Sequence, residues 1–293
     1  IFENRNLNNM NKPFITIFFT LLFFPFFSFS QYYEAGATVG MAGYNGDLSP
    51  VKRTNIGELN PMVGVFGKYN FNKFLSLRLG GNFAQVSADD AEAGDEGRAN
   101  RNLSFKSRII EGSLILEFNI LGYQPYNLER PWSPYVFAGV SVFNFNPRAE
   151  LDGEWYDLQP LGTEGQGLSS FPDREKYSLT EFAIPMGGGI KYAVNDLWNI
   201  GIEAGLRITF TDYLDDVSTT YVDDVLLVEN SEIAAALANR SGSPVSTGQA
   251  RGNPLSDDLY GFIGVFISRN FLDNGLVGSR KRSRRSKNGC PTF

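Results

Sequence analysis

The chain has 293 residues, 42% hydrophobic and 14% aromatic, and its 26 basic and 32 acidic residues give a net charge of −6. This mildly acidic balance argues against general nucleic-acid binding, and the absence of histidine removes the usual general base and metal ligand. The single cysteine, Cys290, has no second thiol with which to form an internal disulfide or a zinc cluster.

The N-terminal part of the chain has the pattern of a secretory signal peptide. A positively charged start is followed by an apolar run over 14–27 and then by small residues that end at Ser30. We expect cleavage after Ser30, with residues 1–9 upstream of the signal. A membrane anchor is the less favoured alternative, because the run is short and contains Pro25. Gln31 stands where a lipoprotein signal would require cysteine.

Eight later segments have the length and composition of β-strands. Most are long enough for a tilted membrane crossing of about 9–11 residues. The segments are 32–44, 61–71, 74–86, 103–120, 135–146, 177–193, 197–211 and 259–271. None of the chain after the signal offers about 20 consecutive apolar residues, so a membrane crossing requires a closed barrel.

Apolar and polar residues alternate along these segments, most clearly in 197–211. Period-two alternation does not reveal which face is inside, and a soluble β-sandwich would reverse the two faces. Strand length, the signal peptide and the glycines on the polar faces favour a narrow barrel of about eight strands. We expect the charged residues of the polar faces to lie in its lumen as paired plugs: Arg78, Glu111, Glu117, Glu203 and Arg207.

The connections between the segments alternate between long and short, as in outer-membrane barrels. The long connections are 45–60, 87–102, 147–176 and 212–258, and the shorter ones are 72–73, 121–134 and 194–196. The sequence therefore predicts an all-β protein in which residues 31–271 form an eight-stranded antiparallel transmembrane outer-membrane β-barrel. Its long loops are extracellular, and both its ends are periplasmic.

The fourth long loop begins with an acidic segment that contains Asp212, Asp215, Asp216, Asp223 and Asp224. A Ca²⁺ site is one interpretation, since hard cations prefer clustered oxygen ligands, but the spacing lacks the pattern of a calcium loop. We favour a solvated loop instead. A helical stretch over 231–238 follows, with Ser231 as its N-cap. Residues 89–101 of the second long loop are also expected to be solvated.

The C-terminal tail, residues 272–293, is a basic segment on an acidic protein. Six positive charges occupy eight positions: Arg280, Lys281, Arg282, Arg284, Arg285 and Lys287. The tail could dock on an acidic partner or on lipid phosphates. An odd cysteine in an exported protein also indicates an intermolecular disulfide, here through Cys290. We favour partner docking over the alternative of a disordered, solubilising tail.

Several stretches resemble the PorG-type outer-membrane β-barrel component of the type IX (Por) secretion system of Bacteroidota. They are residues 31–36 (QYYEAG), 209–221 (TFTDYLDDVSTTY) and 289–291 (GCP), and the second is the most specific. The resemblance implies a non-enzymatic protein without cofactors that sits among outer-membrane lipids. It also implies association with a periplasmic ring built by a lipoprotein and its partner, PorK and PorN, or GldK and GldN in gliding bacteria. The tail and Cys290 would then face that ring.

Other functions remain as alternatives. A small outer-membrane pore or hydrophobic-ligand channel would need an open lumen, which eight strands barely allow. A surface adhesin could be built from the outer loops. An outer-membrane enzyme is the least favoured, because such designs rely on histidine for acid–base chemistry, and we identify no catalytic, cofactor-binding or metal-binding residues.

Overall fold

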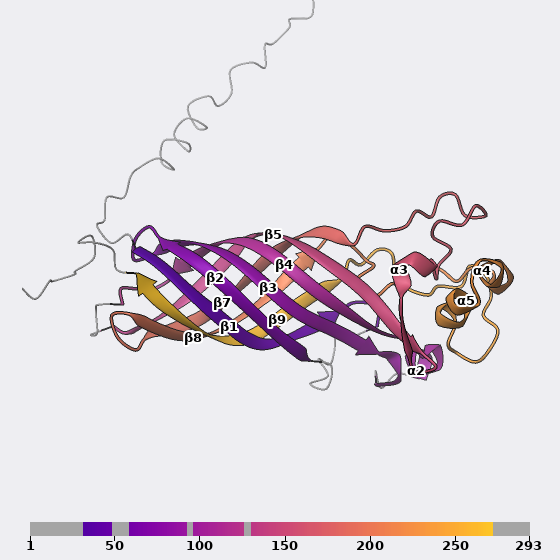
Figure 1. Cartoon of the computed structure of the whole chain (residues 1–293), viewed down its shortest axis with the longest axis horizontal. Coiled ribbons are helices and arrows are strands. Elements are labelled where there is room, and N and C mark those ends of the chain that lie inside the picture. The colour runs from indigo at the N-terminus through magenta and orange to yellow at the C-terminus, as the bar shows by residue number, and fades with distance from the viewer. Residues whose placement is uncertain (1–31, 49–58, 93–95, 126–129, 272–293) are drawn as a thin grey trace, which may run out of the picture.

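A ring of eight long β-strands forms the body of the molecule (Figure 1). The structure is a computed structural model that describes residues 32–48, 59–92, 96–125 and 130–271. The ring strands are β1 (Tyr32–Asn45), β2 (Asn60–Asn70), β3 (Leu75–Asp89), β4 (Ser104–Asn119), β5 (Trp132–Leu151), β7 (Thr180–Ala193), β8 (Trp198–Thr209) and β9 (Leu259–Phe271). All eight predicted segments are confirmed, with ends that shift by a few residues.

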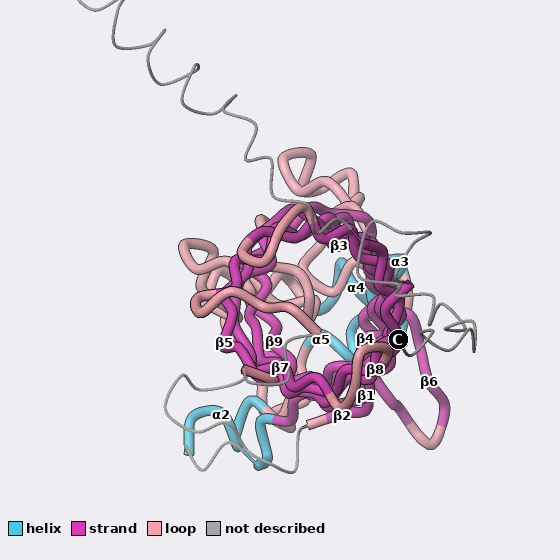
Figure 2. The backbone as a smooth tube through the Cα atoms, turned by 90° about the vertical axis from the view of Figure 1, so that its left-hand side faces the viewer, coloured by secondary structure: helices cyan, strands magenta, loops and turns pink. Residues whose placement is uncertain are grey.

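Every neighbouring pair of ring strands is antiparallel, and the ring closes where β9 pairs with β1. This closing register runs from Tyr33 opposite Phe271 to Asn45 opposite Leu259. Figure 2 shows the ring end-on. Closure gives each of the eight ring strands a partner on both sides, which is the condition for a sheet to cross a bilayer.

The strand β5 is longer than its predicted segment because it continues beyond the ring as a hairpin. Its last residues, Arg148–Leu151, pair with the short strand β6 (Glu154–Asp157). Figure 2 shows β6 standing outside the ring of strands.

The outward face of the wall is apolar and the inward face is polar. Val65, Leu79 and Ile202 are each more than half exposed, whereas Glu117 and Arg207 are buried. Soluble proteins rarely expose apolar patches larger than a few hundred Å². The polar faces of the strands therefore line the lumen, as the sequence predicts, and lipid is the surrounding that such an apolar wall fits.

The two ends of the barrel differ. The described parts of four long connections, residues 46–48 with 59, 90–92 with 96–103, 152–179 and 210–258, lie at one end, which we call the loop end. The opposite end, called the turn end, holds the described parts of the short connections together with Tyr32 and Phe271. The described helices all belong to long connections: the 3-10 turn η2 (Asp90–Glu92), α2 (Glu96–Arg101), α3 (Leu158–Leu161), α4 (Asp224–Asn230) and α5 (Glu232–Ala238).

The predicted N-cap of the fourth long loop is confirmed, because the Ser231 side chain accepts a hydrogen bond from the backbone N–H of Ala234 at the start of α5. None of the helices that the structure describes has the length and hydropathy to span a membrane. The predicted signal peptide, residues 1–30, and the basic tail, residues 272–293 with Cys290, lie outside the described residues.

An arginine placed on the middle of the apolar wall should destabilise the barrel strongly. Leu79 is 67% exposed and lies between Gly67 and Leu114 of the neighbouring strands. We expect Leu79→Arg to lower the free energy of unfolding in lipid vesicles by about 2–4 kcal/mol, and Phe271→Arg at the turn end by about 0–1 kcal/mol. Urea titration followed by tryptophan fluorescence measures both. Equal losses at the two depths would contradict a membrane-spanning wall, and Leu79→Ala controls for lost packing.

Candidate functional site

The lumen holds a balanced set of buried charges. Among the described strand residues, four carboxylates and four cations are buried inside the ring: Glu34, Glu111, Glu117, Glu203, Lys68, Arg78, Lys191 and Arg207. A charge in a dry interior is tolerated only when it is paired and hydrogen-bonded. The pairing in this lumen therefore determines what the barrel can hold or pass.

Glu117 lies at the centre of the larger cluster. Its carboxylate is 2.9 Å from Lys68 Nζ, 3.3 Å from Lys191 Nζ and 3.2 Å from Arg78 Nε. Arg78 also reaches across the lumen to Glu203, with its Nη1 2.6 Å from Oε2. Six of the eight strands contribute to the luminal charges, so the cluster ties opposite walls of the ring together.

A second cluster lies nearer the loop end. Arg207 donates two hydrogen bonds to Glu111, from Nε at 2.8 Å and from Nη2 at 3.0 Å, a bidentate geometry that favours a strong pair. The Tyr260 hydroxyl and the Asn82 amide also donate to Glu111, at 2.6 Å and 2.7 Å. All five charges predicted to be luminal plugs are confirmed as paired.

Three luminal charges escaped the sequence analysis: Glu34, Lys68 and Lys191. Glu34 accepts hydrogen bonds from the Ser268 hydroxyl at 2.6 Å and from Lys68 Nζ at 3.5 Å. The alternation that revealed Arg78 and Glu203 could have revealed these charges as well, because each lies between outward-facing neighbours on its own strand.

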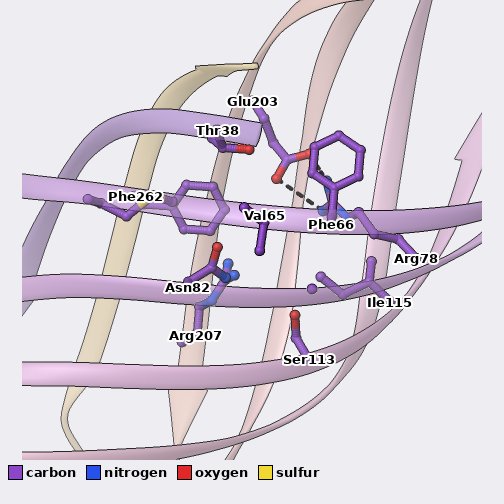
Figure 3. Close-up of a pocket in the computed structure, with 12 residues that line it drawn as sticks. Thr38, Val65, Phe66, Arg78, Asn82, Ser113, Ile115, Glu203, Arg207 and Phe262 are labelled. Atoms are coloured by element: carbon purple, nitrogen blue, oxygen red, sulfur yellow. Dashed lines mark hydrogen bonds and ion pairs between the residues drawn. The ribbon is translucent and has the colours of Figure 1, made fainter. Parts of the chain in front are cut away.

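Little space remains between these side chains. A cavity of about 20 Å³ lies beside the Arg78–Glu203 pair, lined also by Thr38, Phe66 and Phe262 (Figure 3). That volume accommodates about one water molecule. A Cβ added to Gly201 would lie 2.4 Å from the Phe266 ring, so even the predicted luminal glycines face filled space. The lumen is a packed polar core at this level.

The long connections close the loop end by packing on one another. Glu164 of the third long connection accepts hydrogen bonds from the backbone N–H groups of Ser218 and Thr219 in the fourth long connection, at 3.0 Å and 2.9 Å. The guanidinium of Arg251 forms an ion pair with Glu164 at 3.1 Å and donates to the Asp216 carbonyl. We call this packed assembly of loops the loop cap.

The first two long connections join the loop cap through Arg101. Its guanidinium pairs with the buried Asp90 and donates to the backbone carbonyls of Asp47 and Arg251. Residues 89–101 were expected to be solvated, and for Asp90 this is wrong. Asp90 can be buried because the Arg101 guanidinium, eleven residues later in the sequence, donates a hydrogen bond to each of its two carboxylate oxygens.

A tyrosine from the barrel wall holds two carboxyls of the cap. The Tyr44 hydroxyl lies 2.6 Å from Asp215 Oδ2 and 2.8 Å from Asp258 Oδ1. One hydroxyl proton serves only one of these contacts, so the other needs a proton on a carboxyl. Burial first, and the neighbouring carboxylates with it, raises the pKa of both Asp215 and Asp258 well above the ordinary value.

The prediction of a solvated acidic segment is therefore wrong for its first half. Asp212, Asp215 and Asp216 are buried, and Asp216 accepts hydrogen bonds from the hydroxyls of Thr163 and Tyr177. The second half is exposed as expected: Asp223 caps α4 and Asp224 follows it. Within the described part of the chain, no three acidic or thiol side chains gather to hold a metal ion, so the calcium interpretation gains no support.

A closed ring of eight antiparallel strands, apolar outside and filled with paired charges inside, defines the class: an eight-stranded transmembrane β-barrel of the outer-membrane type. The chain belongs to the family described as domain of unknown function (DUF6089), whose model matches residues 11–159, just over half of the sequence. The comparison with curated proteins gives no match.

Three solved structures illustrate the likeness. The N-terminal β-barrel domain of Pseudomonas aeruginosa OprF is 11% identical, with 82% of this chain and 97% of that chain covered and a TM-score of 0.36. Ail of Yersinia pestis is 10% identical, with 83% of this chain and 99% of that chain covered and a TM-score of 0.38. Neisserial surface protein A is 12% identical, with 82% of this chain and 97% of that chain covered and a TM-score of 0.37. The barrel assignment itself rests on the strand pairing of this chain.

Removal of the central luminal carboxylate should be far more costly than removal of a surface one. We expect Glu117→Gln to lower the free energy of unfolding by about 3–5 kcal/mol, because it leaves three buried cations undercompensated. Asp157→Asn, which breaks the part-exposed pair with Arg148, should cost about 0–1 kcal/mol. Urea unfolding in vesicles at pH 7 compares them, and a near-neutral Glu117→Gln would refute the cluster's structural role.

The loop cap should loosen as the pH rises. Burial raises the pKa of Asp212 to about 7 and that of Asp216 to about 6. The folded cap therefore binds these protons more tightly than the unfolded chain does, so its stability falls as the pH rises through about 6 and 7. Hydrogen exchange of residues 211–218, corrected for intrinsic rates, should show less protection at pH 8 than at pH 5.

Asp212→Asn provides the matched variant for this pH dependence. Asparagine has nearly the same shape as the buried Asp212 side chain but carries no ionisable carboxyl. The amide cannot ionise, so the variant should retain more protection at pH 8 while it matches the parent at pH 5. Protection that increases with pH in the parent would contradict the assignment.

Proposed function

We propose that the protein is a non-enzymatic component of the type IX protein secretion system that anchors or stabilises the periplasmic lipoprotein ring at the outer membrane. The observation that carries the proposal concerns the segment of closest resemblance to PorG-type proteins, residues 209–221. Much of this segment is buried in the loop cap, where Asp215 meets Tyr44 and Asp216 meets Tyr177. The residues of the resemblance thus serve closure of the barrel, which suits a scaffold.

The packed lumen also favours a scaffold over a conduit. A pore or hydrophobic-ligand channel needs a continuous passage, whereas the cavity beside Arg78 and Glu203 has room for about one water. Each of the eight buried luminal charges is engaged by an opposite charge. The pore alternative therefore has less support than the anchoring role.

The C-terminal tail gives the anchoring role its proposed contact. The strand β9 ends at Phe271, at the turn end, and the tail continues from there in the sequence. An exported barrel with its long loops on the cell surface has its turn end in the periplasm. The tail would therefore leave the membrane on the side where the ring proteins lie, of the PorK/PorN or GldK/GldN type. We propose Cys290, Arg280, Lys281, Arg282, Arg284, Arg285 and Lys287 as partner-binding residues.

Purification of the tagged protein from its native envelope, with and without reductant, tests the proposal. We expect ring proteins in the eluate, together with an adduct that disappears with reductant and in Cys290→Ser. Replacement of the six basic tail residues by glutamine should lower ring recovery by several-fold at physiological salt, since such contacts are electrostatic. Arg130→Gln, an exposed change at the turn end outside the tail, is the matched control.

The outcomes separate the parts of the proposal. Ring proteins recovered without the adduct would refute the disulfide and leave the anchoring role intact. A barrel recovered alone from gently solubilised membranes would refute the anchoring role. Unchanged ring recovery after neutralisation of the tail would refute the tail contact.

A further inference from the structure

Two neighbouring strands carry cations on their outward faces at the loop end of the wall. On β4 the outward-facing residues are apolar from Phe118 to Ile110, and the next two, Arg108 and Lys106, are basic. On β5 the outward-facing Arg148 lies directly opposite Lys106 in the strand register. The change from apolar to basic within one step along β4 marks the boundary between hydrocarbon and headgroup.

These cations line a hollow in the outer surface. A cavity of about 270 Å³ lies between Gln85, Lys106, Ser107, Arg108, Arg148 and Trp155. Trp155 comes from β6, which stands outside the ring (Figure 2), so the hairpin of β5 and β6 forms one wall of the hollow. The Lys106 ammonium lies 4.8 Å from the centre of the Trp155 ring. We call this hollow the basic pocket.

The basic pocket has a surplus of positive charge. Arg148 is compensated, because its guanidinium pairs with Asp157. Lys106 and Arg108 form no ion pair with any described residue, and both are exposed. Two cations held next to each other in a concave site attract an anion, and a guanidinium matches the geometry of a phosphate.

We propose that the basic pocket binds the phosphate of a membrane lipid from the leaflet that surrounds the loop end. The position identifies the ligand as a lipid, since the outward side chains that follow Arg108 along β4, namely Ile110, Leu114 and Leu116, are apolar. An acyl chain can follow those residues while the phosphate remains beside Arg108 and Lys106. Basic pockets next to a hydrocarbon surface recognise anionic headgroups in this way.

A neighbouring hollow limits where the phosphate can sit. This second cavity, of about 260 Å³, shares Lys106 and Trp155 with the basic pocket, but it also contains Asp89, Glu92 and Glu150. Carboxylates disfavour a phosphate there and accept hydrogen bonds from hydroxyl or amino groups. The pair of hollows therefore fits a headgroup with its phosphate near the membrane and a neutral or amine-bearing part further out.

The arrangement is specific to this side of the barrel. Towards the loop end, the outward positions of β7 and β8 include Phe182, Ile184 and Ile208, which are not charged. Arg269, an outward-facing cation near the turn end, lies over the rings of Trp198 and Phe271 at 5.9 and 5.7 Å instead of lining a cavity. Arg269 thus provides a matched control of the same residue type.

Native mass spectrometry of the purified barrel in detergent, titrated with dioleoyl phosphatidic acid, tests the proposal. We expect one tightly bound lipid, with affinity about fivefold weaker for each cation removed, in Lys106→Gln, Arg108→Gln and the double variant. Arg269→Gln should bind like the parent. Phosphatidylcholine with the same chains should bind more weakly, because its headgroup carries no net charge. Heat-modifiable gel mobility confirms that each variant is folded.

Two results would overturn the inference. Binding by the folded double variant equal to that of the parent would show that the basic pocket is not the site. Complete displacement of the lipid by millimolar inorganic phosphate, with the parent retaining that phosphate, would show a site for free anions. Neither result bears on recovery of the secretion ring, so this inference and the proposed function can fail separately.

Discussion

The pairing of β1 with β9 is the constraint on which the remaining structure depends. In a bilayer each backbone N–H and C=O group must find its partner within the protein, and the register from Tyr33–Phe271 to Asn45–Leu259 supplies those partners for the two terminal strands. Closure with eight strands fixes a ring so narrow that side chains fill it. Each buried inward-facing charge is thereby forced to find an opposite charge, a hydroxyl or an amide within the same small volume.

This requirement explains why the luminal charges come in equal numbers. Glu117 alone would be unstable in so tightly packed a lumen, and Lys68, Lys191 and Arg78 surround it. The same rule continues at the loop end, where Glu164 is compensated by Arg251 and Asp90 by Arg101. Where no cation is available, as at Tyr44, Asp215 and Asp258, a shared proton takes its place. One principle thus organises the barrel interior and the loop cap.

The strands and their faces could be predicted because alternation is a local property, readable along 197–211 without knowledge of any other strand. The ion-pair partner of each luminal charge could not be predicted in this way. Arg78 meets Glu203 because of the stagger of the closed ring, and 125 positions separate them in the sequence. The wrong prediction that Asp215 and Asp216 are solvated has the same origin, since the hydroxyls that hydrogen-bond to them belong to the distant residues Tyr44 and Tyr177. Likewise the basic pocket depends on the position of β6 outside the ring, and the sequence around Trp155 does not indicate that position.

A barrel filled from within and capped at one end meets its surroundings through its surfaces. Three remain: the wall, the loop end and the turn end. The wall faces lipid along most of its height, but at β4 and β5 it is basic and hollowed, which would fix a lipid at one side of the molecule. In the sequence the basic tail follows Phe271, which lies at the turn end, opposite the end that carries the pocket. If both proposals hold, a body fixed to one leaflet near Arg108 and bound to a partner through its tail would keep that partner at a set distance and orientation from the membrane. Such a role requires neither a passage nor a reactive group, and the packed lumen provides the rigidity that it does require.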